Sequence, residues 1–393
     1  MNLRSQSFER VTLLGAIIGS VSLFFPFVVV KENRVVEGVA HFLWELPAPL
    51  LFGVLAAALL GSLVLSRMGE SLRIRYAKVG GGLVIFTAAL LLLSNTGFIL
   101  EREGFEFGRI APSVGFWLLM LSSFVLVDGS LRNAPVSPTA RTIISVAPFV
   151  ILAALLVLGS LDDLAILKEF HNRRERFVRE FFNHIYLSGT AVSFAVIIGV
   201  PLGLLAWKRS RLERPIFVVV NGIQTIPSLA LFGLMIAPLA YLSQRFPALR
   251  QMGIQGIGNA PALIALTLYA LLPIVRNAYT SLAVIPDAVV DAGSGVGMNR
   301  RQLLRFVEFP LSIPIVLSGI RTSAVQAVGN TAVAALIGAG GLGRFVFQGL
   351  GQAAPDLIVM GVLPIIFMAV ALDRILGLVI DRVTPRGSKR ELA

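Results

Sequence analysis

The residues best suited to a specific task are concentrated in one polar segment of the chain, 287–310. It contains Asp-Ala-Gly at positions 291–293, followed by Gly297 and then by Asn299 with Gln302 three residues later. Small residues let another backbone approach closely, and glycine permits a turn that bulkier residues avoid. An Asn followed three residues later by Gln is the pattern of a helix capping box. The segment therefore predicts two short helices joined by a turn, an arrangement suited to docking.

Arginine and apolar residues alternate after the capping box. Arg300, Arg301 and Arg305 are interleaved with Leu, Phe and Val side chains up to Pro310. This spacing predicts a short amphipathic helix that Pro310 ends. From composition alone, such a helix could also rest on lipid headgroups. Protein docking is thus one of two interpretations.

Motifs for catalysis, nucleotide binding and metal binding are missing from the sequence. It has no Gly-x-x-x-x-Gly-Lys-[Ser/Thr], no Gly-x-Ser-x-Gly and no His-Glu-x-x-His. Cysteine is absent, and His41, His171 and His184 are too scattered for a histidine-rich metal site. The glycine-rich run at 340–343 lacks the lysine of a phosphate loop, which favours a flexible helix exit. We expect no catalytic residue, no metal and no cofactor bound by this chain.

The composition indicates a lipid environment. Hydrophobic residues make up 56% of the 393 residues, and the mean hydropathy is +0.82. Charged residues make up 14%, against about 25% in soluble domains. A water-soluble fold could not bury this much apolar side chain. The net charge of +12 then reflects cationic cytoplasmic loops rather than nucleic-acid binding.

Membrane helices must therefore position the polar segment. A bilayer core requires roughly 20 apolar residues of helix, and about ten stretches qualify. The spans are expected at 11–30, 47–66, 80–98, 113–126, 142–161, 187–207, 216–242, 262–282, 315–338 and 357–380. The expected fold class is an all-α polytopic membrane protein.

The distribution of loop charges predicts the orientation of these spans. Lys and Arg concentrate in alternate loops, around 67–78, 132–141, 208–214 and 300–305, and at both chain ends. Cytoplasmic loops retain such cations. Both termini and the segment 287–310 are therefore expected in the cytoplasm.

One long polar stretch divides the chain. Residues 161–185 mix acidic and basic side chains at helical spacing, which predicts a solvated or interfacial amphipathic linker outside the cytoplasm. The part before it, 1–160, has about five spans and receives no function; the part after it, 186–383, has about five more. That second part contains the loop 283–314, and a basic tail follows at 384–393.

Ionisable residues inside the spans are few. Asp373 is the clearest carboxylate, and its neighbour Arg374 is its expected partner. Intramembrane carboxylates mark ion pathways. An ion-gradient-driven carrier of small cationic or zwitterionic solutes is therefore the alternative function, with little support from the sequence.

The segment 287–310 resembles an element of a known family. Asp-Ala-Gly at 291–293, Gly297, and the later Phe309-Pro310 are similar to the EAA loop of membrane permeases in binding-protein-dependent ABC importers. The family pattern has Glu, Ala and Leu where this chain has Asp291, Gly293 and Phe309. The resemblance implies a coupling helix that docks on a separate ATPase. The coupling residues it implies are Asp291, Ala292, Gly293, Gly297, Arg300, Arg301 and Pro310.

Further segments resemble permeases for glycine betaine and related osmoprotectants. They are Gln-Thr-Ile-Pro-Ser-Leu-Ala at 224–230, Leu-Pro-Ile-Val-Arg-Asn at 272–277, and Gly-Asn-Thr at 329–331 leading to the glycine loop. Prolines inside spans free carbonyls that can line a cavity. The implied translocation pathway contains Gln224, Thr225, Pro227, Ser228, Tyr269, Pro273, Asn330 and Thr331. Tyr269 could form part of an aromatic cage for a quaternary ammonium or serve ordinary packing.

The resemblance implies a permease subunit with a five-helix type I ABC importer core in the bacterial inner membrane. The expected partners are ABC ATPase subunits that bind ATP and Mg²⁺, a periplasmic or extracytoplasmic solute-binding protein, and a second permease, identical or homologous. The surrounding lipid bilayer is a further partner, and nucleic acid is not. The exact solute stays open.

Overall fold

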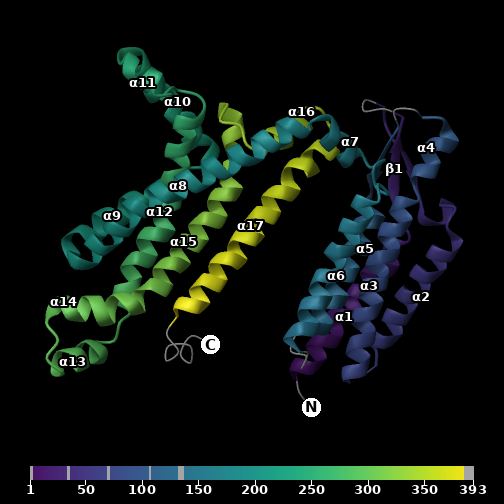
Figure 1. Cartoon of the computed structure of the whole chain (residues 1–393), viewed down its shortest axis with the longest axis horizontal. Coiled ribbons are helices and arrows are strands. Elements are labelled where there is room, and N and C mark those ends of the chain that lie inside the picture. Colours follow the sequence, from purple (N-terminus) through teal and green to yellow (C-terminus); the bar gives the residue numbers. More distant parts are fainter. Residues whose placement is uncertain (1–2, 33–35, 69–70, 106–107, 132–136, 385–393) are drawn as a thin grey trace. The chain divides into compact units, whose positions relative to one another are not determined.

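The computed structural model describes the chain except for residues 1–2, 33–35, 69–70, 106–107, 132–136 and 385–393 (Figure 1). It has two compact units, Met1–Asn172 and Arg173–Ala393, here called unit 1 and unit 2 and described separately. The division falls inside the polar stretch 161–185. The expected basic tail lies, beyond Thr384, outside the described residues, as do residues 132–136 of one cationic loop.

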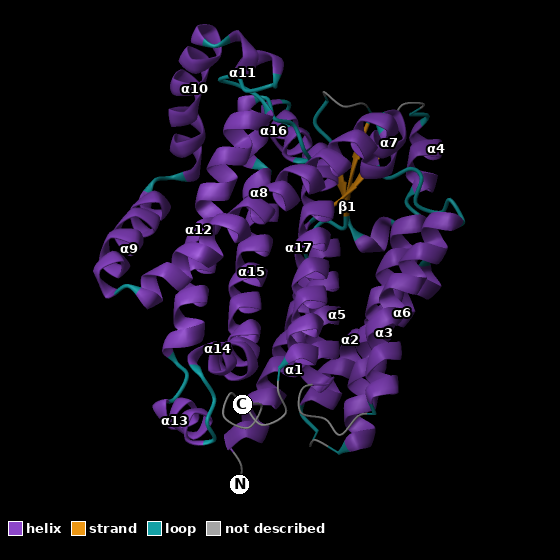
Figure 2. Cartoon of the chain, turned by 60° about the vertical axis from the view of Figure 1, so that its left-hand side comes forward, coloured by secondary structure: helices purple, strands orange, loops and turns teal. Residues whose placement is uncertain are grey.

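Unit 1 is a helical bundle with a small sheet at one end (Figure 2). In the bundle, α5 packs against both α1 and α3, and α2 packs against α3. The elements are α1 (Leu3–Ser22), β1 (Val28–Lys31), β2 (Val39–His41), η1 (Leu43–Glu45), α2 (Pro49–Ser66), α3 (Leu72–Ser94), α4 (Gly97–Glu103), β3 (Arg109–Pro112), α5 (Val114–Leu131), α6 (Pro138–Val157) and α7 (Ala165–Asn172).

The sheet corrects the first expected span, 11–30. Helix α1 ends at Ser22, and β1 begins at Val28, two residues after Pro26, as the central strand of an antiparallel sheet in the order β2-β1-β3. Proline cannot continue the helix, and the valines that follow it favour extended backbone. The pairs across β1 are Val28–His41, Val29–Ala40 and Val30–Val39 on one side, and Val28–Pro112, Val29–Ala111, Val30–Ile110 and Lys31–Arg109 on the other.

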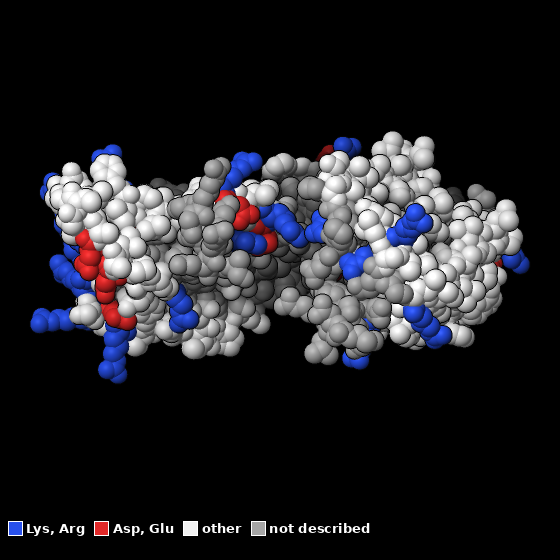
Figure 3. Space-filling model, turned by 90° about the horizontal axis from the view of Figure 1, so that it is seen from below, with Lys and Arg blue, Asp and Glu red and all other residues white. Residues whose placement is uncertain are grey.

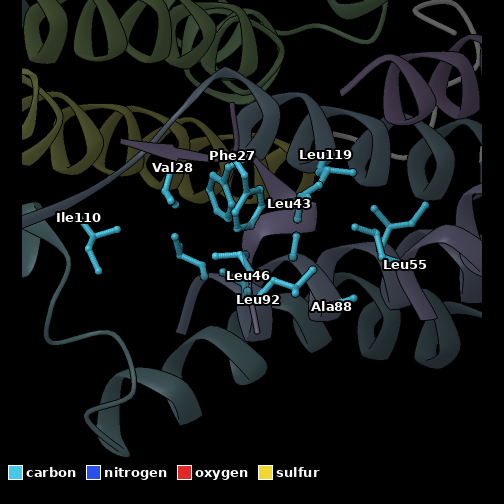
Figure 4. Packing of buried hydrophobic residues seen from close by; sticks show 14 of the residues in the cluster. Phe27, Val28, Leu43, Leu46, Leu55, Ala88, Leu92, Ile110 and Leu119 are labelled. Carbon is cyan, nitrogen blue, oxygen red and sulfur yellow. The ribbon is translucent and has the colours of Figure 1, made fainter. Parts of the chain in front are cut away.

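A hydrophobic core joins the sheet to the helices of unit 1 (Figure 4). Phe27, just before β1, meets Phe116 of α5 edge to face, with ring centroids 5.8 Å apart. Leu55 of α2 and Leu92 of α3 are fully buried in the same cluster. Burial of one such side chain is favourable by about 1.5–3 kcal/mol, so this core ties the sheet firmly to the bundle.

Unit 2 contains the polar segment singled out in the sequence. Its elements are α8 (Arg174–Lys208), α9 (Ser210–Thr225), α10 (Ser228–Arg245), α11 (Pro247–Gln251), α12 (Asn259–Ala283), α13 (Asp287–Gly295), α14 (Arg300–Leu303), the π turn η2 (Leu304–Glu308), α15 (Phe309–Thr331), η3 (Val333–Ile337), α16 (Gly343–Gly351) and α17 (Pro355–Val383).

Small side chains bring the helices of unit 2 close together. The Thr267 hydroxyl of α12 donates to the Ala191 carbonyl of α8, and Gly203 of α8 lies against the backbone of α12. The Ser323 hydroxyl of α15 donates to the Ala270 carbonyl at 2.8 Å. Such contacts are typical of membrane helix interfaces. The order of these contacts along the chain shows that α8 and α12 run parallel and that α15 runs antiparallel to α12. The ends of α8 and α12 therefore lie near the beginning of α15.

The number of spans is lower than the ten expected. Among the described residues, eight helices are long and apolar enough to cross a membrane, or nine if one bent pair forms a single span. That pair, α9 and α10, replaces the expected span 216–242 and is bent by 103°. The bend falls at Ile226–Pro227, because the residue before a proline is disfavoured in helical conformation. The expected span 315–338 is also wrong at its end, since α15 stops at Thr331.

Candidate coupling and translocation site

Helices α13 and α14 form a tight hairpin, residues 287–303, called the coupling hairpin below. Gly297 lies between them with φ +86°, which is the left-handed region that favours glycine. The Met298 N–H donates to the Gly293 carbonyl at 3.2 Å, and the Gly297 N–H donates to the Ser294 carbonyl at 3.0 Å. This pair of bonds is a Schellman motif, which ends α13 and satisfies its last carbonyls. The turn predicted at Gly297 is confirmed.

Gly293 allows the two helices of the hairpin to touch. It is buried, and a Cβ added there would stand 2.5 Å from Cδ1 of Leu303. Leu303 of α14 is itself only 3% exposed. The glycine that departs from the family pattern is therefore matched to a leucine on the opposite side of the hairpin.

The capping box predicted at Asn299 and Gln302 is confirmed. The Gln302 N–H donates to Asn299 Oδ1 at 3.0 Å, and the Asn299 N–H donates to Gln302 Oε1 at 2.9 Å. These two bonds satisfy donors at the start of α14 that have no partner within the helix.

The expectation that Pro310 ends the second short helix is wrong. The chain passes from α14 through a π turn into α15, and Pro310 is in the first turn of α15. The Phe309 N–H donates to the Leu304 carbonyl, five residues back. The wider π turn accommodates the proline ring, which would clash with a carbonyl inside a regular helix.

The outer face of the coupling hairpin is exposed. Asp291, Ala292, Gly297 and Arg301 all face solvent, and Val296 is 77% exposed. Figure 3 views this end of unit 2, where basic side chains surround a short acidic band. Exposed cations near the ends of α8 and α14 are Lys208, Arg209, Arg211, Arg214, Arg300, Arg301 and Arg305.

Three of the predicted pathway residues meet at the bend between α9 and α10. The Gln224 Nε2 group donates to the Tyr269 carbonyl at 2.6 Å, and the Tyr269 hydroxyl donates to the Ile226 carbonyl. Pro227 is the N-cap residue of α10. Tyr269 is 9% exposed, and its hydroxyl supports the bend through the bond to the Ile226 carbonyl. Thr225 and Ser228 flank the bend, and the Thr225 hydroxyl donates to the Gly222 carbonyl.

The remaining predicted pathway residues lie elsewhere on α12 and α15. The Pro273 carbonyl of α12 accepts a hydrogen bond from Asn277 Nδ2 at 2.8 Å. Asn330 is half-buried and Thr331 is buried at the end of α15, where the Thr331 hydroxyl donates to the Ala327 carbonyl.

A buried polar cluster on α8, not predicted from the sequence, holds the glycine loop at 338–343. Oε2 of Glu180 accepts from the Gly341 N–H at 2.7 Å, and its Oε1 accepts from Arg344 Nη1 at 2.9 Å. Asn183 Nδ2 donates to the Ala339 carbonyl at 2.7 Å. Glu180 is 3% exposed. The loop interpreted as a flexible helix exit is thus tied down, and the polar stretch 161–185 is only partly solvated.

His184 completes this cluster with both ring nitrogens. Its Nδ1 lies 3.2 Å from the Leu342 N–H, and its Nε2 lies 2.9 Å from the Val328 carbonyl. A backbone N–H requires an acceptor and a carbonyl requires a donor, so the ring is neutral with its proton on Nε2. The available signal was the spacing of Glu180, Asn183 and His184, which places three polar side chains on one face of a helix.

Asp373 pairs with a different arginine from the one expected. Its two carboxylate oxygens accept from Nε and Nη2 of Arg321, both at 2.6 Å. This fork joins α15 to α17. A carboxylate held by both arginine nitrogens is a structural link, which reduces the case for an ion pathway.

Comparison with known proteins gives two family matches. Residues 191–388 match the binding-protein-dependent transport system inner membrane component, and residues 9–167 match the N-terminal domain of the ABC transporter permease YehY. The second match covers the spans to which no function was assigned. Both descriptions favour an ATP-driven system over an ion-gradient carrier.

Individual relatives match about half of this chain over nearly their whole length. The osmoprotectant import permease protein OsmW of Salmonella typhimurium is 42% identical over 206 residues, covering 52% of this chain and 91% of the relative. The glycine betaine/carnitine/choline transport system permease protein OpuCB of Bacillus subtilis is 36% identical, covering 52% and 87%. A solved structure of the MetNI methionine ABC transporter is 23% identical with a TM-score of 0.46, covering 53% of this chain and 96% of that one.

The family model spans half of this all-α membrane chain, including the coupling hairpin. The two relatives align with about half of the chain at 36–42% identity. The chain therefore belongs to the family of binding-protein-dependent transport system inner membrane components, the permease subunits of ABC importers.

Proposed function

We propose that the chain is the permease of an ATP-driven importer for glycine betaine or a related osmoprotectant. The printed names of the relatives, which cite osmoprotectant, glycine betaine, carnitine and choline transport, support this solute class. The loop charges support an inner-membrane orientation with both termini in the cytoplasm.

The observation that carries the proposal is the exposed coupling hairpin. Its shape is fixed by the Schellman motif at Gly297 and the capping box at Asn299, so a rigid element projects from the ends of the spans. A separate ATPase subunit would bind this hairpin through Asp291, Ala292 and Gly297 and would supply the ATP and Mg²⁺ site. The sequence itself has no phosphate-binding loop.

The solute path proposed here follows the bend at Ile226–Pro227. The hydrogen bonds from Gln224 and Tyr269 support this choice, because a broken helix is tolerated in a membrane only where its free carbonyls are satisfied or line a cavity. A solute-binding protein would deliver the solute from outside the cytoplasm, and a second permease would complete the path. Tyr269 is too buried in this structure to serve as an open aromatic cage.

The test is to co-express the chain with a candidate ATPase and measure uptake of labelled glycine betaine into proteoliposomes. Gly297→Trp should leave the chain inserted, abolish ATPase co-purification and stop uptake. Gly253→Trp is the matched control, because Gly253 has φ +78° and equally open surroundings; it should retain the ATPase. Wild-type uptake by the Gly297→Trp variant would contradict the docking role.

A further inference from the structure

Arg300 and Arg301 are adjacent in sequence but differ in what they touch. Arg300 Nη1 lies 2.7 Å from Oε1 of Glu308, and its Cζ lies 5.8 Å from the ring centroid of Trp207. Arg301 is exposed and takes part in neither contact. The side chain of Arg300 is 62% exposed, but its guanidinium contacts the ends of two spans, whereas Arg301 makes neither of these contacts.

The two partners of Arg300 belong to two different membrane helices. Trp207 is in the last turn of α8, and Glu308 is in the π turn that leads into α15. One guanidinium thus joins the hairpin to the end of one span and to the beginning of another. An arginine suits this position because its planar group can stack on an aromatic ring while it donates to a carboxylate.

Glu308 gives this contact its energetic weight. Its side chain is 3% exposed, and its second oxygen, Oε2, is buried without a hydrogen-bond partner among the described residues. A buried carboxylate is costly unless a cation accompanies it. Removing the guanidinium would leave this charge uncompensated inside the π turn between the hairpin and α15.

We infer that Arg300 is a positioning residue that fixes the coupling hairpin on α8 and α15, rather than a contact for the ATPase. The inference rests on the proposed function for its role in transport, but its structural part does not. Movement of the hairpin would reach α8 through this side chain, and α15 through both this side chain and the π turn. Arg301 remains available to the ATPase.

A first experiment tests the structural part on the full chain alone. The chain has no cysteine, so spin labels can be placed at Ser294→Cys in α13 and Leu204→Cys in α8, both exposed. We expect Arg300→Ala to broaden the distance distribution between the labels and Arg301→Ala to leave it narrow. The double variant Arg300→Ala with Glu308→Gln should give a narrower distance distribution than Arg300→Ala alone, because the unpaired charge of Glu308 is gone. A narrow distribution in Arg300→Ala overturns the inference.

A second experiment tests the consequence in the reconstituted complex with its ATPase. Arg300→Ala should retain the ATPase at the wild-type ratio while the solute imported per ATP falls at least about fivefold, the lower end of typical coupling energies. Arg301→Ala should instead reduce the amount of ATPase retained. Equal loss of ATPase in both variants, or unchanged import per ATP in Arg300→Ala, contradicts the inference. If the wild-type chain binds no ATPase but Arg300→Ala broadens the distance distribution as expected, the proposed function fails and the positioning role of Arg300 stands.

Discussion

The carboxylate of Glu180 accepts a hydrogen bond from the backbone N–H of Gly341, 161 residues later in the chain, at 2.7 Å. The bond connects the start of α8 with the loop between α15 and α16. Arg344 neutralises the same carboxylate from the other side. The end of unit 2 opposite the coupling hairpin is therefore held by a side chain, a backbone amide and an ion pair.

Glu180→Ala should loosen this end of unit 2. Loss of a hydrogen bond to a charged group costs about 1.5–3 kcal/mol, so the variant should melt at a lower temperature in detergent. Amide exchange at Gly341 and Leu342 should accelerate, while exchange in the coupling hairpin stays unchanged. Glu180→Gln keeps an acceptor oxygen, so its melting temperature and its exchange at Gly341 should lie between those of the wild type and Glu180→Ala. Unchanged exchange at Gly341 in Glu180→Ala would refute the assignment.

Gly340→Ala should be destabilising at the same loop. Gly340 has φ +83°, and an added Cβ would stand 2.7 Å from both Asn183 Nδ2 and Glu180 Oε2. Strain of this kind costs about 1–3 kcal/mol, which should appear in the free energy of unfolding. The matched control is Gly351→Ala at the end of α16, where nothing lies within 4 Å. Equal stability of the two variants would show that the loop can adopt another conformation.

Tyr269→Phe should weaken the bend between α9 and α10. The change removes the hydroxyl that donates to the Ile226 carbonyl and leaves that carbonyl without this donor. The expected loss of stability is about 1–3 kcal/mol, accompanied by slower solute uptake. Tyr241→Phe serves as the control, because Tyr241 is 68% exposed. If the two variants transport equally well, the hydroxyl of Tyr269 has no part in the pathway.

The turn and the capping box of the coupling hairpin could be predicted from the sequence, but the buried cluster on α8 could not. Gly297 and the Asn299–Gln302 pair act within a few residues of themselves, so their spacing indicates the turn and the cap directly. Glu180 and His184 find their partners more than 140 residues away. Their spacing places them on one face of a helix, but nothing near them in sequence shows whether that face is buried or solvated.

Pairing by sequence proximity failed at Asp373 for a geometric reason. Residues adjacent on a helix do not face each other, so Arg374 is poorly placed to donate hydrogen bonds to this carboxylate. The true partner, Arg321, lies 52 residues earlier on α15. Hydropathy likewise identified the apolar stretch 216–242 but not its break, because Pro227 changes the backbone direction without changing the composition.

The Arg321–Asp373 fork should hold α15 and α17 together. Arg321→Gln and Asp373→Asn should each lower the melting temperature, since each removes one half of a bidentate ion pair. The double variant should melt close to the single variants, because the interaction is lost only once. A double-mutant cycle of melting temperatures measures this coupling. Strictly additive losses would mean that the two side chains act independently.

The length of α15 has a mechanical consequence. Its 23 residues form a rod about 34 Å long, which begins after the π turn at Glu308 and ends at Thr331. Tilting such a rod by about 5° swings its tip by about 3 Å, roughly the diameter of a water molecule. If the coupling hairpin docks on an ATPase as proposed, a tilt of this size at the lower end of α15 would displace its tip, beside the glycine loop, by about the width of a water molecule.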